Sequence, residues 1–541
     1  MPNPNASSDP IMDAWTAAGL PSTEAVMAGA GELAGQFLRW HGAPRIPELL
    51  GLFCRELPAG RVLLYGAGTL TQALLGHLPD GIRVAGIIDR RAGDIATFCG
   101  FPVLSAAEAL DRQHDYVLLA HNAYEMEMAA TLVKVGFAAD RIVALHADPR
   151  YRAFIAPTVE RLVEEACRHS GDAAIVNCNS PIIHDRQLAD WLPPDRTIQL
   201  FMGRSANELD RNGLYETVDL RESLDALRAA LLRRRPRVVY VRSMLFKNYL
   251  GMLIKRWLPR TTVVQEFYDY ATLWPDADLA NLFGLNAVSM DWLRRAELIA
   301  GQTLDLVISK RGGAQWHRVQ DRCRAPYRLV FPQMVEGPPD RPGPPRADLV
   351  YAGFLPSRSF LRSFPVGYNF MPLLEDVCRD GGLTADIFNA AHNGAEGDAI
   401  FADYLRDYEK PPLAYHRRLS YSELMDILGS YRFGWLCNDQ RTVHPDRQVG
   451  ICNRWTGYLS AGLPVLLDAS WGAMGDLTRE YGAGLVIERL ESGTVIDTIR
   501  NADHTALAAG ARRLRSHLLA VNAAAMIDIA AVIGRGLERG V

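Results

Sequence analysis

The sequence predicts an α/β protein made of three parallel-sheet units. Short apolar runs of strand length alternate with amphipathic stretches of helix length along most of the chain. The alternation is interrupted twice, by a helical connector at 151–171 and by a proline-rich linker at 336–347. Strands that alternate with helices form parallel sheets covered by helices on both faces, so each uninterrupted section predicts one such sheet.

The composition limits the class of protein. The chain has 541 residues, of which 48% are apolar and 22% are charged, and its formal net charge is −4. These values are typical of a soluble globular protein with several domains, and they predict no basic surface for nucleic acid. The cysteines form no CxxC or Cys/His cluster, so we expect no metal site and no disulfide framework. Reduced cysteines favour a cytoplasmic location.

The sequence predicts neither a signal peptide nor a transmembrane helix. Residues 1–15 lack the basic and apolar regions of a signal peptide, and we find no apolar run of about 18 residues. A peripheral contact with the inner face of a membrane stays open for the stretch LFKNYLGMLIKRWLPR (245–260), which mixes basic and apolar residues. An ordinary helix packed on a sheet is the alternative for this stretch.

The apolar runs set the expected strands. In the first unit (60–150), which follows a helical N-terminal segment (1–59), they lie in 61–78, 83–91, 115–121 and 141–145. In the second unit (172–335) they lie in 172–181, 197–203, 237–243, 261–269, 305–310 and 327–333. In the third unit (348–541) they lie in 348–355, 383–389, 433–439, 464–468 and 484–488, before a closing helix at 504–535. The last two units, joined by the linker, suggest two lobes that face a cleft.

The first unit contains a glycine turn. Gly66 and Gly68 lie between an apolar strand and an amphipathic helix, and Asp89 ends the next strand. In Rossmann-like folds such glycines let the backbone approach a phosphate, and such an acid binds a ribose. The unit resembles the small Rossmann-like domains attached to sugar-nucleotide and surface-polysaccharide enzymes. Gly66, Gly68 and Asp89 therefore predict either a second nucleotide site or a scaffold that binds no nucleotide.

Three stretches of the third unit resemble a known family. They are LVYAGFLPSRSF (349–360), YHRRLSYSELMDILGSYRFGWLCND (415–439) and NRWTGYLSAGLPVLLDASWGAMGDLTREYGAGLVIE (453–488). In this order and spacing they resemble the donor lobe of glycosyltransferase family 4 (group 1). The resemblance implies the GT-B fold, in which two Rossmann-like lobes bind the acceptor (172–335) and the nucleotide-sugar donor (348–541).

The resemblance also implies an activity. It is the transfer of a sugar from a nucleotide-diphosphate-sugar, such as a UDP- or GDP-sugar, to a hydroxyl of a glycan or glycoconjugate. The family resemblance implies retention of the anomeric configuration. We expect a hexosyltransferase of surface polysaccharide or glycoconjugate biosynthesis that requires no cofactor and no metal.

The same stretches contain candidate donor-binding residues. Asn453 and Arg454 open the helix of the third stretch, whose first N–H groups and positive dipole end suit a diphosphate. Arg447 lies on the loop before this helix, and Arg358 follows the first strand of the lobe. Arginine can bind phosphate oxygens through two parallel bonds, so these cations and the helix dipole would replace a divalent ion. Candidates for contact with the nucleotide or the sugar are Gly353, Tyr415, His416, His444 and Asp446.

Candidate acceptor-side residues follow strands of the second unit. Glu266 and Asp269 end the strand in 261–269, and His184 follows the strand in 172–181. A carboxylate or an imidazole near the attacking hydroxyl can accept its proton, so these three are the candidate catalytic residues. A loop stabilised by capping interactions is the alternative explanation for them.

The sequence departs from the family at two positions. Where the family has two glutamates in its donor-sugar motif, this chain has Val449 and Gly457. A non-catalytic sugar-nucleotide-binding or assembly subunit is therefore the alternative to a transferase. Another GT-B enzyme, such as a nucleotide-sugar epimerase, and an NAD-dependent oxidoreductase that uses the glycine turn are further alternatives.

Overall fold

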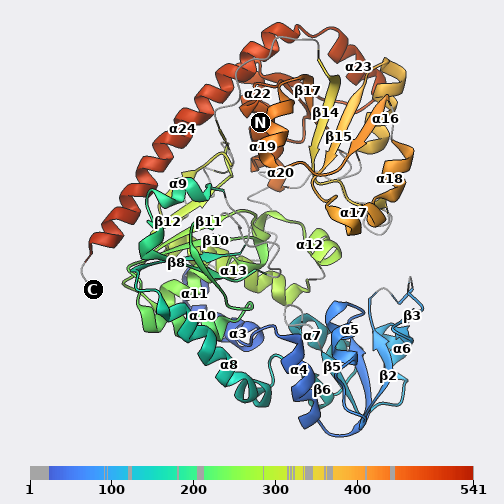
Figure 1. The fold of residues 1–541 in the computed structure, drawn as a ribbon, viewed down its shortest axis with the longest axis vertical. Coiled ribbons are helices and arrows are strands. Elements are labelled where there is room, and N and C mark those ends of the chain that lie inside the picture. Colours follow the sequence, from blue (N-terminus) through green and yellow to red (C-terminus); the bar gives the residue numbers. More distant parts are fainter. Residues whose placement is uncertain are drawn as a thin grey trace, which may run out of the picture.

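Three sheets lie one after another along the long axis of the molecule (Figure 1). The structure is a computed structural model, and it describes the chain between residues 23 and 539. Within that range it leaves out residues 91, 94, 120–124, 179–181, 204–212, 284, 314–315, 317–319, 321–322, 333, 336–344, 359–360, 362–369, 409–410 and 439–444.

The first sheet belongs to the N-terminal unit. Its strand order is β3-β4-β2-β1-β5-β6, and all neighbours are parallel except β3 and β4. The strands are β1 (Gly60–Tyr65), β2 (Ile82–Ile88), β3 (Thr97–Phe98), β4 (Phe101–Leu104), β5 (Tyr116–Leu119) and β6 (Ile142–Ala144). The helices of this unit are α4 (Pro47–Phe53), α5 (Thr69–Leu75), α6 (Ala106–Leu110) and α7 (Glu125–Val135).

The second sheet forms the N-lobe, and its seven strands are all parallel. Their order is β13-β12-β11-β10-β7-β8-β9. The strands are β7 (Ala173–Asn177), β8 (Thr197–Phe201), β9 (Glu216–Asp219), β10 (Val238–Ser243), β11 (Thr262–Phe267), β12 (Leu306–Ser309) and β13 (Tyr327–Leu329). Strands such as β10 are buried on both faces, which explains why they read as continuous apolar runs in the sequence.

Besides the closing helix described below, helices from two parts of the chain surround the N-lobe sheet. They are α2 (Thr23–Ala28), α3 (Ala30–His41), α8 (Pro149–Arg168), α9 (Asp185–Ala189), α10 (Leu224–Arg234), α11 (Leu250–Trp257), α12 (Asp276–Phe283) and α13 (Ala287–Thr303). Leu33 and Phe37 of α3 belong to the N-lobe core, so the N-terminal helical segment contributes to that core. The apolar residues Leu250 and Leu253 of α11 are buried in the same core, which favours the packed-helix interpretation of the 245–260 stretch.

The third sheet forms the C-lobe, and its six strands are also parallel. Their order is β16-β15-β14-β17-β18-β19. The strands are β14 (Ala347–Gly353), β15 (Ala385–Asn389), β16 (Leu413–His416), β17 (Tyr431–Leu436), β18 (Val465–Asp468) and β19 (Gly484–Ile487). The helices are α16 (Met371–Gly381), α17 (Gly394–Ile400), α18 (Ala402–Asp407), α19 (Tyr421–Leu428), α20 (Pro445–Val449), α21 (Asn453–Ser460), α22 (Gly472–Tyr481), α23 (Ser492–Arg500) and α24 (His504–Glu538).

The corner between α21 and β18 ends the helix within one turn. Gly462 has a φ of 71°, a left-handed conformation that glycine adopts without steric cost. The N–H of Leu463 donates to the carbonyl of Tyr458 at 2.9 Å, and Pro464 then cannot continue the helix. The chain therefore enters the buried strand β18 at once. The N-terminus of α21 lies at the end of the helix that is away from this corner.

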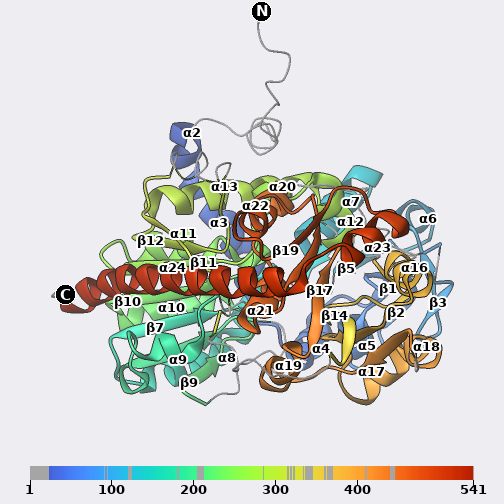
Figure 2. The same ribbon diagram turned by 90° about the horizontal axis from the view of Figure 1, so that it is seen from above.

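The helix α24 crosses from the C-lobe to the N-lobe (Figures 1 and 2). Leu514 and Leu518 lie in a C-lobe core cluster, whereas Ile529 and Ile533 lie in an N-lobe core cluster. By length and hydropathy α24 could span a membrane, and 28% of its most apolar window is buried. The expectation of no transmembrane helix rested on uninterrupted apolar runs, whereas α24 meets the criterion by the mean hydropathy of an 18-residue window. Since core helices pass the same test, the helix does not by itself assign the chain to a membrane.

The expected fold class is confirmed. The described residues form three α/β units with sheets that are parallel apart from the β3–β4 pair, and the last two units form the two lobes of a GT-B arrangement. The carboxyl ends of parallel strands in such sheets are the usual place for a ligand, so the site is sought where those ends meet.

Candidate functional site

Two short segments of backbone, one from each lobe, lie against each other. The segment after β12, residues 310–312, lies against residues 449–451, which precede α21. Gly312 N–H donates to the carbonyl of Val449, and Ile451 N–H donates to the carbonyl of Lys310, both at 2.9 Å. The carboxyl edge of the N-lobe sheet therefore contacts the chain that leads into α21.

Arg311 joins the lobes at this junction. Its side chain is 0% exposed, and its Nη2 lies 2.9 Å from Asp269 Oδ1 of the N-lobe and 2.5 Å from Asp446 Oδ1 of the C-lobe. Burial alone would raise the pKa of Asp269, but the charges of Lys310 and Arg311 hold it below its ordinary value. Two candidates from opposite lobes, Asp269 and Asp446, thus share one cation.

Sequence reasoning did not identify Arg311 as part of the site. The signal was present, because Lys310 and Arg311 directly follow the apolar run that forms β12. The ammonium of Lys310 lies 3.3 Å from the ring centroid of Tyr268, which adds a cation–π contact beside the same cluster.

The N-terminus of α21 lies beside the carboxyl end of β14. The N-cap residue Cys452 makes no side-chain capping bond. The side chain of Arg454 packs against Gly353, where a Cβ would lie 2.4 Å from Arg454 Cδ, and its guanidinium lies 4.8 Å from the ring centroid of Tyr351. The structure thus brings Gly353 and Arg454 together, as both were predicted to lie at the donor site.

Two further donor candidates lie near the same helix start. Asn453 is the first residue of α21, and its Oδ1 is buried without a hydrogen-bond partner among the described residues. Arg447 lies on α20, where its Nη1 donates to Ser470 Oγ at 3.4 Å and its guanidinium lies 5.4 Å from the ring centroid of Trp471. Arg447 is therefore held at the carboxyl end of β18, since Ser470 and Trp471 follow that strand.

Arg358 is engaged elsewhere, which argues against its predicted phosphate contact. Its guanidinium binds Asp407 at 2.5 Å and Asp403 at 3.6 Å, both on α18. It also lies 4.8 Å from the ring centroid of Tyr404. Two carboxylates already balance this cation, so the geometry supports a structural role.

The candidates at the end of β16 are also held inside the C-lobe. Tyr415 lies in a C-lobe core cluster, where its hydroxyl accepts a bond from Asn389 Nδ2 at 2.9 Å, and burial raises its pKa to about 12. His416 lies 3.2 Å from Asp386 and stacks on Phe388 with 4.6 Å between ring centroids. These contacts do not support the predicted role of Tyr415 at the nucleotide. His444 lies outside the described residues.

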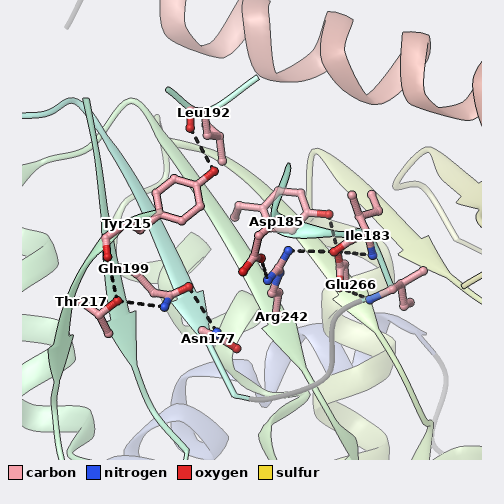
Figure 3. Close-up of polar contacts among 11 residues, drawn as sticks. Asn177, Ile183, Asp185, Leu192, Gln199, Tyr215, Thr217, Arg242 and Glu266 are labelled. Atoms are coloured by element: carbon pink, nitrogen blue, oxygen red, sulfur yellow. Dashed lines mark hydrogen bonds and ion pairs between the residues drawn. The ribbon is translucent and has the colours of Figure 1, made fainter. Parts of the chain in front are cut away.

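Glu266 is part of a buried network that fixes a loop (Figure 3). Its carboxylate accepts bonds from the amides of Ile182 at 2.8 Å and Ile183 at 3.3 Å, and from the hydroxyl of Tyr240 at 2.6 Å. Burial raises its pKa, against the opposing charge of Arg242. Since Glu266 is 0% exposed, the geometry gives it a structural role and does not support the predicted contact with an acceptor.

The same network positions His184. Arg242 is fully buried; it donates to the carbonyl of Ile183 at 2.8 Å and forms an ion pair with Asp185 (Figure 3). The ring centroid of His184 lies 6.2 Å from that of Tyr421, which belongs to α19 of the C-lobe. Burial, followed by the charge of Arg242, lowers the pKa of His184, and its Nε2 has no hydrogen-bond partner among the described residues. A neutral imidazole therefore faces the C-lobe.

The two positions that depart from the family have distinct surroundings. Val449 is fully buried in the N-lobe core cluster, although it belongs to α20 of the C-lobe. A Cβ on Gly457 would meet no atom within 4 Å, so α21 has room for a small side chain at this position although Gly457 is buried. A carboxylate at 449 would be buried among apolar side chains, which is unfavourable for an ionised group without a partner.

In the N-terminal unit, the side chain of Asp89 forms a hydrogen bond with the glycine turn. Asp89 Oδ2 accepts a bond from Ala67 N–H at 2.7 Å, so Asp89 stabilises the turn between Gly66 and Gly68. This edge of the sheet faces the N-lobe, because Arg90 donates to the carbonyl of Ala280 and Ser289 donates to Glu127. The second nucleotide site stays a prediction.

Comparisons with known proteins give low similarity. The family described as C2185-like, N-terminal matches residues 59–143. No curated protein matches the chain. Among solved structures, Anabaena HepE in complex with UDP-glucose is 13% identical, covers 66% of this chain and 99% of its own, and has a TM-score of 0.47. The spinosyn forosaminyltransferase SpnP (14% identity, 67% and 99% coverage, TM-score 0.39) and Acinetobacter baumannii MurG (9%, 67% and 99%, 0.38) are similar over the same extent.

Among the described residues no group of three His, Cys, Asp or Glu side chains could hold a metal ion.

Proposed function

We propose that the chain is a glycosyltransferase that moves a sugar from a nucleotide-diphosphate-sugar to an acceptor hydroxyl. The observation that carries the proposal is the N-terminus of α21. It makes no side-chain capping bond, carries Arg454 beside Gly353, and lies next to the contact between the lobes. A helix N-terminus offers amide donors and a positive dipole end, which together favour a diphosphate.

On the donor side, three groups would supply positive charge to the diphosphate. Arg454 and Arg447 would bind oxygens of the diphosphate, and the dipole of α21 would add to their field. When the bond between the sugar and the diphosphate breaks, negative charge grows on the leaving oxygen. Cations that are fixed in position before the reaction stabilise that charge without reorganisation.

On the acceptor side, His184 would accept the proton that the acceptor hydroxyl loses. The new bond forms between the anomeric carbon and the acceptor oxygen, and the acceptor hydroxyl gives up its proton. The lowered pKa keeps the His184 imidazole neutral, and its Nε2 has no hydrogen-bond partner among the described residues, so it would accept that proton or orient the hydroxyl. Asp269 is the weaker base, because Lys310 and Arg311 lower its pKa.

We extend the proposal on the family resemblance. The donor would be a UDP- or GDP-hexose, the anomeric configuration would be retained, and the product would belong to a surface polysaccharide or glycoconjugate. The acceptor and a cytoplasmic location, with or without contact with a membrane surface, belong to the same proposal.

Calorimetric titration with UDP, GDP, ADP and CMP, followed by the matching sugar nucleotides, tests the function. We expect one nucleotide to bind, and Arg454→Ala to weaken it by about 10-fold, the effect of losing one charge-assisted bond. Arg379→Ala is the matched control, because Arg379 pairs with Asp376 at the exposed end of α16. If no nucleotide binds the wild-type protein, the proposal is wrong.

A nucleotide-sugar-binding subunit without transferase activity is the second candidate. The packing of Val449 and the absence of a carboxylate at Gly457 favour it, because the family's sugar-contacting acids are missing. This candidate predicts nucleotide binding with neither hydrolysis nor transfer, whereas a transferase releases free nucleotide from its donor. Release of nucleotide from a sugar-nucleotide panel therefore separates the two.

A further inference from the structure

We propose that Arg311 is a positioning residue that holds the two lobes in register, so that the acceptor-side loop and the donor-side helix start act as one rigid unit. The inference deepens the proposed function and rests on it for its catalytic consequence. Three parts of the chain are involved: Arg311, residues 268–270 of the N-lobe and residues 445–451 of the C-lobe. We call these three parts together the clasp.

The charge arrangement of the clasp is complementary across the lobes. Arg311 is fully buried, and one of its nitrogens lies within 3 Å of carboxylates from both lobes, 2.9 Å from Asp269 and 2.5 Å from Asp446. Without the guanidinium, Lys310 would still lie 3.5 Å from Asp269, but Asp446 would lose the cation that lies 2.5 Å from it and joins it to the N-lobe. A buried charge that loses its partner destabilises its surroundings far more than an exposed one.

Backbone and apolar contacts fix the same junction. Two hydrogen bonds join Gly312 to Val449 and Lys310 to Ile451, and the Val449 side chain lies in the N-lobe core. The ring of Tyr270, next to Asp269, lies 6.0 Å from the guanidinium of Arg311. Asp446 and Val449 are therefore attached to the N-lobe on one side of α20.

The other side of α20 is attached to the C-lobe. Gln448 Nε2 donates to the carbonyl of Ser470 at 2.9 Å, and Arg447 donates to the hydroxyl of the same residue. Since Asn453 and Arg454 begin the next helix, the position of the proposed phosphate site depends on both attachments. Among the proposed donor groups Arg311 contacts Asp446, so it would act on Arg447 and Arg454 through Asp446 and α20.

This arrangement predicts that loss of Arg311 affects turnover more than it affects nucleotide affinity. Each lobe keeps its own groups when Arg311 is lost, so nucleotide affinity should change less than 3-fold. Alignment of acceptor and donor should suffer, because a shift of about 1 Å can cost ~100-fold in rate. We expect kcat to fall by that order in Arg311→Met and to recover partly in Arg311→Lys, which restores the charge but not the fork.

Hydrogen exchange on the full chain tests the clasp independently of activity. Asp269→Asn changes only the N-lobe, yet we expect it to accelerate exchange across the junction, at the amides of Gly450 and Ile451. Asp446→Asn should accelerate the amide of Gly312 in return. Arg432→Met is the control, because Arg432 forms its 2.9 Å ion pair with Asp348 inside the C-lobe.

The outcomes separate the two proposals. Unchanged exchange across the junction in both asparagine variants would overturn the clasp, as would an equal loss of nucleotide affinity and turnover in Arg311→Met. If Arg311→Met does not fold, the asparagine variants carry the test. If the wild-type protein binds no nucleotide but the exchange results are as expected, the clasp stands as a structural link and the proposed function fails.

Discussion

The side chain of Arg454 occupies the space in which any side chain at Gly353 would lie. A Cβ at position 353 would be 2.4 Å from Arg454 Cδ and 3.1 Å from its Nε. The end of β14 and the start of α21 can approach this closely only because residue 353 has no side chain. The orientation of the arginine at the proposed phosphate site is therefore set by a glycine about a hundred residues earlier in the chain.

The Gly353→Ala variant tests this dependence. The added methyl group should push Arg454 out of its position and weaken nucleotide binding by about 10-fold, as the loss of one charge-assisted hydrogen bond would. Calorimetric titration measures the effect. Gly493→Ala is the control, because a Cβ there meets no atom within 4 Å. Equal affinity in Gly353→Ala and wild type would contradict the assignment of Arg454 to the phosphates.

Gly457 permits the opposite test of packing. A Cβ at this position meets nothing within 4 Å, and alanine favours a helix over glycine, so Gly457→Ala should stabilise the C-lobe by about 0.5–1 kcal/mol. Gly434→Ala should destabilise it, because its Cβ would lie 2.3 Å from the ring of Tyr458. Urea unfolding measures both. A loss of stability in Gly457→Ala would mean that the room beside Gly457 is filled in solution.

Glu127 should make the contact between the N-terminal unit and the N-lobe depend on pH. Burial raises its pKa to about 7, although the hydroxyl of Ser289 on α13 opposes the shift. An unfolded glutamate titrates near pH ~4.3, so between that pH and about 7 the native state binds more protons than the unfolded state. Stability should therefore fall as pH rises through this window, and should change no further above it on account of Glu127.

Thermal unfolding from pH 5 to pH 8 checks the expectation. Glu127→Gln should remove the fall, which we expect to be roughly 2 kcal/mol in wild type. Ser289→Ala should extend the fall to higher pH, because the hydroxyl stabilises the ionised carboxylate. Identical pH profiles for wild type and Glu127→Gln would show that the carboxylate is solvated in solution.

Glu266→Gln should loosen the loop that carries His184. One oxygen of the carboxylate would become an amide donor that faces the N–H of Ile182 or Ile183, so a buried hydrogen bond is lost. We expect a loss of about 2 kcal/mol in stability and faster exchange at both amides. Glu108→Gln, in an exposed capping box on α6, is the control for a general effect of charge. Slow exchange at Ile182 and Ile183 in Glu266→Gln would contradict the anchoring role.

Local patterns predicted the fold, because alternation of apolar runs with helical stretches depends on neighbours in the sequence. The buried strand β10 and the abrupt corner at Gly462 are both visible in this way. The packing of α24 on the N-lobe was not predictable in the same way. Its two apolar segments look alike in the sequence, and only the tertiary arrangement assigns Leu518 and Ile529 to different lobes.

Residues of the candidate site were harder to predict than the fold, because the role of a charged side chain depends on the residues that it contacts in the folded chain. Arg358 and Arg454 looked equivalent as arginines at strand ends, yet Arg358 pairs with Asp407 while Arg454 packs over Gly353. Glu266 looked like a catalytic base, but backbone amides of a distant loop donate hydrogen bonds to it. Arg311 was missed because its two partners lie in different lobes.

The course of α24 has a consequence for how the protein is made. Ile529 and Ile533 complete an apolar cluster whose other members, such as Ala173 and Tyr240, are synthesised far earlier. The N-lobe emerging from the ribosome therefore exposes a row of apolar side chains until the closing helix follows, well after the C-lobe strands have been translated. The N-lobe core is therefore completed only when the last helix of the given sequence has been translated, so the N-lobe and the C-lobe finish folding together.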